Sequence, residues 1–251
     1  MVDEIEVEKE AGVATVSFNR PTKRNAITQP MYRAMTEALR EAAQDDDVRV
    51  LRFRGYGPHF TAGNDLSDFQ AAVEGDSQEA ESRHFLHAVV DFPKPLVAQV
   101  KGFAVGIGTT LLLHCDFVLA STDTRFSLPF VKLGVVPEFA SSRLLPALVG
   151  RHLSARLLLL GDEFNAKQAQ AMGLLSELRT PESLAAATWR LCERIAAMPP
   201  GAVQATRGLL RTEEDRRRLH EAIDAEWAVF AERLRSPEHK AAVEAFFQKR
   251  K

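Results

Sequence analysis

An apolar run leads directly into a glycine-rich loop in the stretch Pro95-Leu96-Val97-Ala98-Gln99-Val100-Lys101-Gly102-Phe103-Ala104-Val105-Gly106-Ile107-Gly108. Residues 95–100 predict a buried strand that is entered through a proline. Glycine lets the backbone approach a ligand closely, and the helix expected from Thr109 to His114 would begin with unpaired N–H groups. The stretch therefore predicts a strand, a ligand-binding loop and a helix in succession.

The chain on either side of this stretch predicts an α/β fold. Upstream, period-two alternation indicates a hairpin, and Thr28 is the expected N-cap of a helix that runs to Ala42. From Ser142 onward the pattern is almost wholly helical, so we expect a core of repeated strand–strand–helix units followed by an α-helical region. The expected strands are 5–7, 13–18, 48–53, 95–100 and 117–120, with a glycine-punctuated loop at 55–66. The expected helices, besides 28–42, are 79–90, 144–148, 153–160, 166–172, 184–197, 202–210, 219–233 and 237–248.

The composition excludes several classes of protein. The 251 residues are 45% hydrophobic and 26% charged, with a formal net charge of −2, which is typical of a globular domain and favours neither nucleic acid nor a membrane surface. No apolar run approaches the roughly 20 residues of a membrane span, and the acidic start Met1-Val2-Asp3-Glu4 is unlike a secretory signal. We expect a cytoplasmic protein with two reduced cysteines, with a peroxisome or mitochondrion as alternative compartments.

Glu138 is the one carboxylate in the apolar stretch 130–142. A glutamate after Pro137 and before Ser141 is also typical of an ordinary helix start, where the helix dipole favours it. In an apolar cleft, by contrast, the same carboxylate would have a raised pKa and would serve as a base near neutral pH. We expect a purely structural role for Asp116, namely a hydrogen bond at a helix-to-strand junction.

Two glycine loops could place two N–H donors on one substrate oxygen. They are Phe60-Thr61-Ala62-Gly63-Asn64-Asp65 and Gly106-Ile107-Gly108, and fixed donors of this kind stabilise an oxyanion in acyl chemistry. The second loop is not a dinucleotide fingerprint, because Leu111 occupies the place of the third glycine. We expect no metal site, since His84 and His87 have no carboxylate or thiol at ligand spacing.

Several segments resemble the crotonase (enoyl-CoA hydratase/isomerase) superfamily. They are Asn19-Arg20-Pro21-Thr22-Lys23-Arg24-Asn25-Ala26, the loop 60–66, Pro93-Lys94-Pro95-Leu96-Val97-Ala98, the stretch 100–108, Cys115-Asp116 and Leu133-Gly134-Val135-Val136-Pro137-Glu138. The resemblance implies a crotonase-like spiral of ββα units at 1–195 and a helical trimerisation region at 196–251, assembled as a homotrimer or hexamer. It also implies an acyl-CoA thioester substrate and no separate cofactor, since coenzyme A is part of the substrate.

The resemblance further assigns roles to residues. It implies that the backbone N–H groups of Asn64 and Ile107 hold an enolate oxygen. It implies a substrate site that is lined by Lys23, Arg24, Ala62, Gly63, Asp65, Leu66, Gly106, Gly108, Thr110, Phe130 and Phe139.

Two positions depart from the hydratases of this superfamily. Their two catalytic glutamates are replaced here by Thr110 and Phe130, so the pair needed to add water across a double bond is missing. The chain is more similar to peroxisomal-type Δ3,Δ2-enoyl-CoA isomerases, in which a single glutamate, here Glu138, moves the proton; Phe139 replaces the small residue that usually follows it. Ring-enoyl isomerisation, weak hydration and a catalytically silent CoA-binding scaffold remain alternatives.

Overall fold

The computed structural model describes residues 4–66 and 81–248 and has at its centre a six-stranded sheet in the order β1-β2-β3-β4-β6-β9. β1 and β2 form the predicted antiparallel hairpin, and every other neighbouring pair is parallel. The expected strands of this sheet are thereby confirmed. The strands are β1 (Ile5–Glu10), β2 (Val13–Phe18), β3 (Val50–Gly55), β4 (Leu96–Val100), β6 (Phe117–Ser121) and β9 (Glu177–Arg179).

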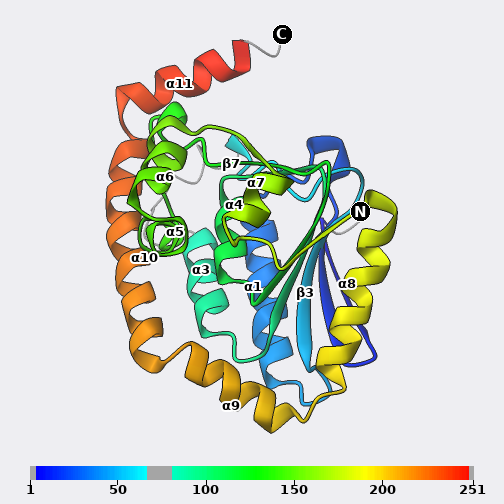
Figure 1. Cartoon of the computed structure of the whole chain (residues 1–251). Coiled ribbons are helices and arrows are strands. Elements are labelled where there is room, and N and C mark those ends of the chain that lie inside the picture. The colour runs from blue at the N-terminus through cyan, green and yellow to red at the C-terminus, as the bar shows by residue number, and fades with distance from the viewer. Residues whose placement is uncertain (1–3, 67–80, 249–251) are drawn as a thin grey trace.

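Helices cover both faces of this sheet, as Figure 1 shows. On one face α8 (Pro181–Ala196) packs on one residue from each of four strands, namely Val13, Val50, Val97 and Leu119. On the other face α1 (Gln29–Gln44) and α3 (Glu81–Asp91) enclose the main core. Because both faces are covered, the parallel strands bury apolar residues on both sides, although the face under α8 also buries Thr15, Arg52 and Gln99. Thr28 is the N-cap of α1 as predicted, with its hydroxyl accepting from Met31 N.

A second, three-stranded sheet lies beside the first and was not predicted. It consists of β5 (Phe103–Val105), β7 (Arg125–Ser127) and β8 (Phe164–Asn165), in that order. The expectation of an almost wholly helical chain after Ser142 is therefore wrong at β8 and at β9. Strands of two or three residues are too short to show a period, and only their pairing partners, β7 and β6, define them.

The remaining C-terminal helices confirm the predicted helical region. Residues 79 and 80 of the predicted helix 79–90 lie outside the described residues. Long α10 packs along α3 and reaches α5, while α11 contacts the turn at Val131–Leu133 (Figure 1). The division into 1–195 and 196–251 stays a prediction, and its boundary falls at the end of α8, whose last residue is Ala196. The remaining helices are α4 (Ile107–Thr110), α5 (Ser141–Val149), α6 (Arg151–Ala155), α7 (Ala166–Ala171), α9 (Pro200–Leu210), α10 (Glu213–Leu234) and α11 (Pro237–Gln248). Short 3-10 turns lie at Pro21–Lys23, at Leu111–His114 (η3) and at Val131–Leu133. A π turn lies at Arg156–Leu160.

None of the helices in the described part of the chain is both long and apolar enough to cross a membrane. The C-terminal helices are amphipathic or strongly charged, and α10 in particular carries acidic residues in its first turn.

A buried ion pair ties α9 to the sheet. The Asp116 carboxylate accepts hydrogen bonds from the backbone N of Leu96 and from Arg207 Nε, each at 2.8 Å. Arg207, which is 8% exposed, also donates to the carbonyl of Phe92 at 2.6 Å. The structural role expected for Asp116 is thus confirmed, and the cation that accompanies it comes from 91 residues further along the chain.

We predict that Arg207→Leu lowers the free energy of unfolding by roughly 2 kcal/mol or more, because the substitution leaves the Asp116 carboxylate without its main cation in a largely buried place. Urea unfolding at pH 7 measures this loss. Arg156→Leu is the control: it breaks an ion pair with Asp162 in which the Arg156 side chain is 68% exposed, and it should cost at most about 1 kcal/mol. Equal losses in the two variants would contradict the role given to Arg207.

Candidate active site

The two glycine loops lie side by side. Thr61 N donates to the Phe103 carbonyl at 3.1 Å, and Val105 N donates to the Thr61 carbonyl at 3.2 Å. A Cβ atom on Gly63, whose φ is +86°, would lie 2.8 Å from the Val105 carbonyl oxygen. A Cβ atom on Gly108 would lie 2.4 Å from the Thr61 methyl group. The loops approach this closely because neither glycine has a side chain.

The two predicted oxyanion donors belong to these paired loops. Ile107 is the first residue of α4, which Gly106 caps with φ +55°. Asn64 follows Gly63 and forms a bridge with Ile27. Within residues 4–66 and 81–248, neither the Asn64 nor the Ile107 amide N–H donates to a backbone carbonyl. Both donors are therefore free of the backbone pairing that surrounds them, as an oxyanion site requires.

Glu138 lies inside the protein and is only 4% exposed. Its Oε1 atom has no hydrogen-bond partner among the described residues. The pKa of Glu138 is raised to about 8, mainly by burial and also by the neighbouring Glu226 carboxylate, while a hydrogen bond from the Asn64 side chain acts in the opposite direction. A carboxyl group with this pKa can accept and return a proton near neutral pH.

The Asn64 side chain connects Glu138 to the first glycine loop. The hydroxyl of Tyr32, on the buried face of α1, donates to Asn64 Oδ1, and the Asn64 side chain in turn hydrogen-bonds Glu138. Burial, together with the charge of Glu138, keeps the pKa of Tyr32 well above 10, so its hydroxyl stays a donor. We expected Asn64 to act through its backbone alone; its side chain has a second contact. Tyr32 was missed, and its place on the apolar face of a helix signalled only burial.

The turn that carries Glu138 is held by His114 and Glu226, two residues that sequence reasoning also missed. Phe139 and Ala140 have φ values of 63° and 53°, in the left-handed region. His114 Nε2 donates to the Phe139 carbonyl at 2.8 Å, and the two rings stack with centroids 3.9 Å apart. Burial lowers the pKa of His114 to about 3, so the ring is neutral. The Glu226 carboxylate accepts from the backbone N–H groups of Ala140 and Ser142.

The residues that the resemblance placed around coenzyme A gather at the first loop. Lys23 and Arg24 are exposed, and the Arg24 carbonyl accepts from Ala62 N at 2.9 Å. Asp65 Oδ2 lies 2.5 Å from Arg20 Nη1, so its carboxylate has a cationic partner that was not predicted. Leu66 is partly buried and is the last described residue of this segment. An exposed pair of cations beside the loop suits an anionic ligand group.

The two positions that hold glutamate in hydratases are buried and carry no titratable group here. Thr110 is fully buried, and its hydroxyl donates to the Ile107 carbonyl at 3.4 Å. Phe130 is 5% exposed, and its ring lies beside Gly106. Neither position therefore provides a second carboxylate that could act together with Glu138 in a hydration.

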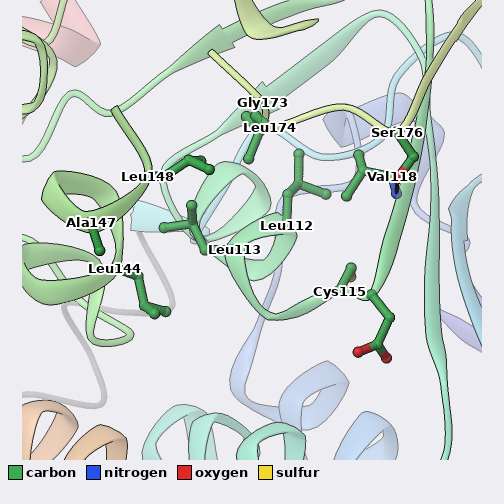
Figure 2. Close-up of a pocket in the computed structure, with 11 residues that line it drawn as sticks. Leu112, Leu113, Cys115, Val118, Leu144, Ala147, Leu148, Gly173, Leu174 and Ser176 are labelled. Atoms are coloured by element: carbon green, nitrogen blue, oxygen red, sulfur yellow. Dashed lines mark hydrogen bonds between the residues drawn. The ribbon is translucent and has the colours of Figure 1, made fainter. Parts of the chain in front are cut away.

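A separate cavity of about 370 Å³ opens between η3, α5 and the segment 173–176 (Figure 2). Most of its lining is apolar, including Leu112, Leu144 and Leu174, and none of the predicted site residues contributes to it. No cluster of three or more histidine, cysteine, aspartate or glutamate side chains suited to a metal ion occurs within residues 4–66 and 81–248.

Comparisons with known proteins place this geometry in context. The sequence pattern described as "Enoyl-CoA hydratase/isomerase" matches residues 8–251. The chain is 37% identical over 245 residues to the rat protein "Enoyl-CoA delta isomerase 2", a match that covers 96% of this chain and 62% of the rat protein. It is 30% identical to the Escherichia coli "2,3-dehydroadipyl-CoA hydratase", covering 99% and 97%. A crystal structure of an enoyl-CoA hydratase/isomerase from Pseudoalteromonas atlantica superposes with a TM-score of 0.93 at 35% identity and covers 98% of each chain.

We predict that Glu138→Gln stabilises the protein increasingly as the pH rises. With a pKa of about 8 against an ordinary value of 4.5, the folded protein holds a proton that the unfolded chain has lost between these pH values. The free energy of unfolding of the unsubstituted protein therefore falls across this window, whereas the glutamine variant has no such proton. Since one unit of pKa corresponds to about 1.4 kcal/mol, the difference between the two proteins should grow by roughly 2 kcal/mol or more from pH 5 to pH 8.

Denaturant unfolding at several pH values measures this difference. Glu232→Gln, which removes an exposed carboxylate from α10, controls for the loss of one negative charge. A difference between Glu138→Gln and the unsubstituted protein that stays constant from pH 5 to pH 8 would show that Glu138 titrates normally and is not buried as described.

Proposed function

Because the chain belongs to the enoyl-CoA hydratase/isomerase family, we propose that it is an enoyl-CoA isomerase that converts a 3-enoyl-CoA into the trans-2-enoyl-CoA. One observation carries the proposal: a buried glutamate, with its pKa raised to about 8, adjoins paired glycine loops, while Thr110 and Phe130 fill the places of the hydratase acids. The similarity to a rat enoyl-CoA delta isomerase supports the same activity, although the chain spans only 62% of that protein's length.

In the proposed reaction a single carboxylate moves one proton between two carbons. Ionised Glu138 takes a proton from C2 of the substrate, and the electrons of the C–H bond move toward the thioester carbonyl to form a conjugated enolate. The N–H groups of Asn64 and Ile107 donate to the enolate oxygen and stabilise its charge. Protonated Glu138 then returns the proton to C4, and the double bond settles between C2 and C3. Atoms and charge balance without any co-reactant.

The surroundings of Glu138 suit this role. Phe130, Val136 and Phe139 are apolar neighbours in sequence that would keep water from the enolate. Tyr32 and Asn64 orient the carboxylate through the hydrogen bonds described above. Hydration is the second candidate, favoured by the similarity to a bacterial hydratase, but it needs a second acid or base that the chain lacks at Thr110 and Phe130.

We predict that Glu138→Gln lowers kcat/KM for a 3-enoyl-CoA about a thousandfold, because glutamine has the same size but cannot accept the proton. Absorbance of the conjugated 2-enoyl thioester measures the product. In the unsubstituted protein, kcat/KM should rise with pH and level off above the pKa of about 8, since only the ionised carboxylate removes the proton.

Four outcomes would contradict the isomerase proposal. Isomerisation that survives Glu138→Gln would remove Glu138 from the mechanism. Efficient turnover of a 2-enoyl-CoA to the 3-hydroxyacyl-CoA, with little isomerisation, would favour hydration. Acyl-CoA binding without turnover would favour a scaffold, while turnover confined to ring-enoyl thioesters would replace the straight-chain substrate.

The proposal includes assembly into a trimer or hexamer. Leu209 and Leu210, on α9, are 81% and 78% exposed in the single chain, and Leu159 and Leu160 are also exposed. Exposed leucines in pairs are typical of surfaces that another chain covers. We predict that light scattering coupled to size-exclusion chromatography gives the mass of three or six chains. The mass of one chain at micromolar concentration would contradict this assembly.

A further inference from the structure

The turn that presents Glu138 depends on contacts from distant parts of the chain. Phe139 and Ala140 both adopt left-handed backbone conformations, which residues with a Cβ atom rarely adopt. The helix that follows, α5, begins at Ser141, and no side chain of its own N-cap residue, Ala140, satisfies its first N–H groups. Two strained residues and an uncapped helix do not hold their shape by themselves, so other elements must supply the restraint.

Glu226, on α10, supplies that restraint. One of its carboxylate oxygens accepts from Ala140 N at 2.7 Å and the other from Ser142 N at 2.9 Å. The two amides flank the start of α5, and the two hydrogen bonds span 86 and 84 residues of chain. Hydrogen bonds to a carboxylate are stronger than neutral ones, and a bidentate pair also fixes orientation. Glu226 therefore acts as the missing cap of α5 and holds the turn immediately after Glu138.

Glu226 also brings a second carboxylate close to the first. Two N–H donors, one at each oxygen, favour the ionised form of Glu226 and counteract the burial that raises its pKa. Its negative charge opposes the ionisation of Glu138, and it is the largest contribution after burial to the raised pKa of Glu138. Within the described residues, Tyr32 from α1 contacts Asn64 and His114 from η3 contacts Phe139, and both side chains are uncharged near neutral pH.

The neighbours of Glu226 do not neutralise it. Asp224, on the same helix, pairs with Arg83 and His87 on α3. Arg217 and Arg218, more than two helical turns before Glu226 on α10, pair with Glu214. No ion pair of Glu226 with a cation occurs within residues 4–66 and 81–248, so backbone amides are the groups that balance its charge there.

We infer that Glu226 is a positioning residue of the active site, which clamps the left-handed turn that presents Glu138 and keeps a negative charge close to that carboxylate. The kinetic part of this inference rests on the isomerase function proposed above; the structural part does not. α10 thereby contributes to the acid–base chemistry of a site formed by the central sheet and its loops.

The kinetic test compares the pH dependence of kcat/KM for a 3-enoyl-CoA in Glu226→Gln, Glu226→Asp and the unsubstituted protein. Glu226→Gln removes the charge and one of the two acceptors, so we expect the acid limb to move to lower pH by roughly half a unit to one unit and the plateau to fall about tenfold. Glu226→Asp keeps the charge but shortens the reach, so the limb should stay in place while the plateau falls. Glu232→Gln, the exposed control on α10, should change neither.

A second measurement does not require activity. The gain in stability on Glu138→Gln, followed from pH 5 to pH 8, reports the titration of Glu138 in the folded protein. In the Glu226→Gln background this pH-dependent gain should shrink, because Glu138 ionises more readily once the neighbouring charge is gone. The four proteins form a double-mutant cycle, and circular dichroism establishes that each one folds. Should Glu226→Gln not fold, Glu226→Asp carries the kinetic test by itself.

The outcomes separate the two proposals. An acid limb that does not move in Glu226→Gln, together with additive stability changes, would overturn the inference and reduce Glu226 to a helix cap. An unchanged plateau in Glu226→Asp would overturn the positioning role. An unsubstituted protein without isomerase activity, but with a non-additive cycle, would support the coupling of Glu226 to Glu138 and remove the isomerase proposal alone.

Discussion

The burial of the Glu138 carboxylate with too few hydrogen-bond partners is the constraint on which the rest of the site depends. An ionised carboxylate is unfavourable in an apolar interior, and the group responds by holding its proton to a higher pH. One oxygen has no partner among the described residues, and a single side-chain contact, from Asn64, favours the charged form. The fold therefore keeps this carboxylate in an environment that is unfavourable for its charge. The left-handed turn at Phe139 and Ala140, directly after Glu138, is part of the structure that keeps it there.

The sheet topology explains why the glycine loops meet. β3 and β4 are parallel neighbours, so the loops that follow them leave the same edge of the sheet. One loop contains Gly63 and Asn64, and the other contains Ile107 and Gly108. Their contact is close enough that a Cβ atom on either glycine would collide with the opposite loop. The amide groups of Asn64 and Ile107 consequently share one place in the fold, although more than 40 residues of chain separate them.

Much of the fold could be predicted from local pattern, and the failures have a common cause. Period-two alternation predicted β2, and the Thr28 cap predicted the start of α1. β8 and β9 were missed because two or three residues show no period; β7 and β6 define them by pairing. A related reason explains why the sequence analysis missed Tyr32, His114 and Glu226. Each of these residues contributes to the site through contacts with residues far away in sequence, and the residues next to it in sequence do not indicate those contacts.

By itself, the sequence determined the α/β class, the two glycine loops, the replacement of both hydratase acids by Thr110 and Phe130, and the isolation of Glu138 among apolar residues. These are local properties, since residue type and spacing decide backbone freedom and polarity. The tertiary structure alone decided that Asn64 contacts Glu138 through its side chain, that Asp65 pairs with Arg20, and that α10 caps the turn after Glu138. Burial and electrostatic coupling depend on which distant groups come within a few ångströms of each other, and only the packed chain establishes those distances.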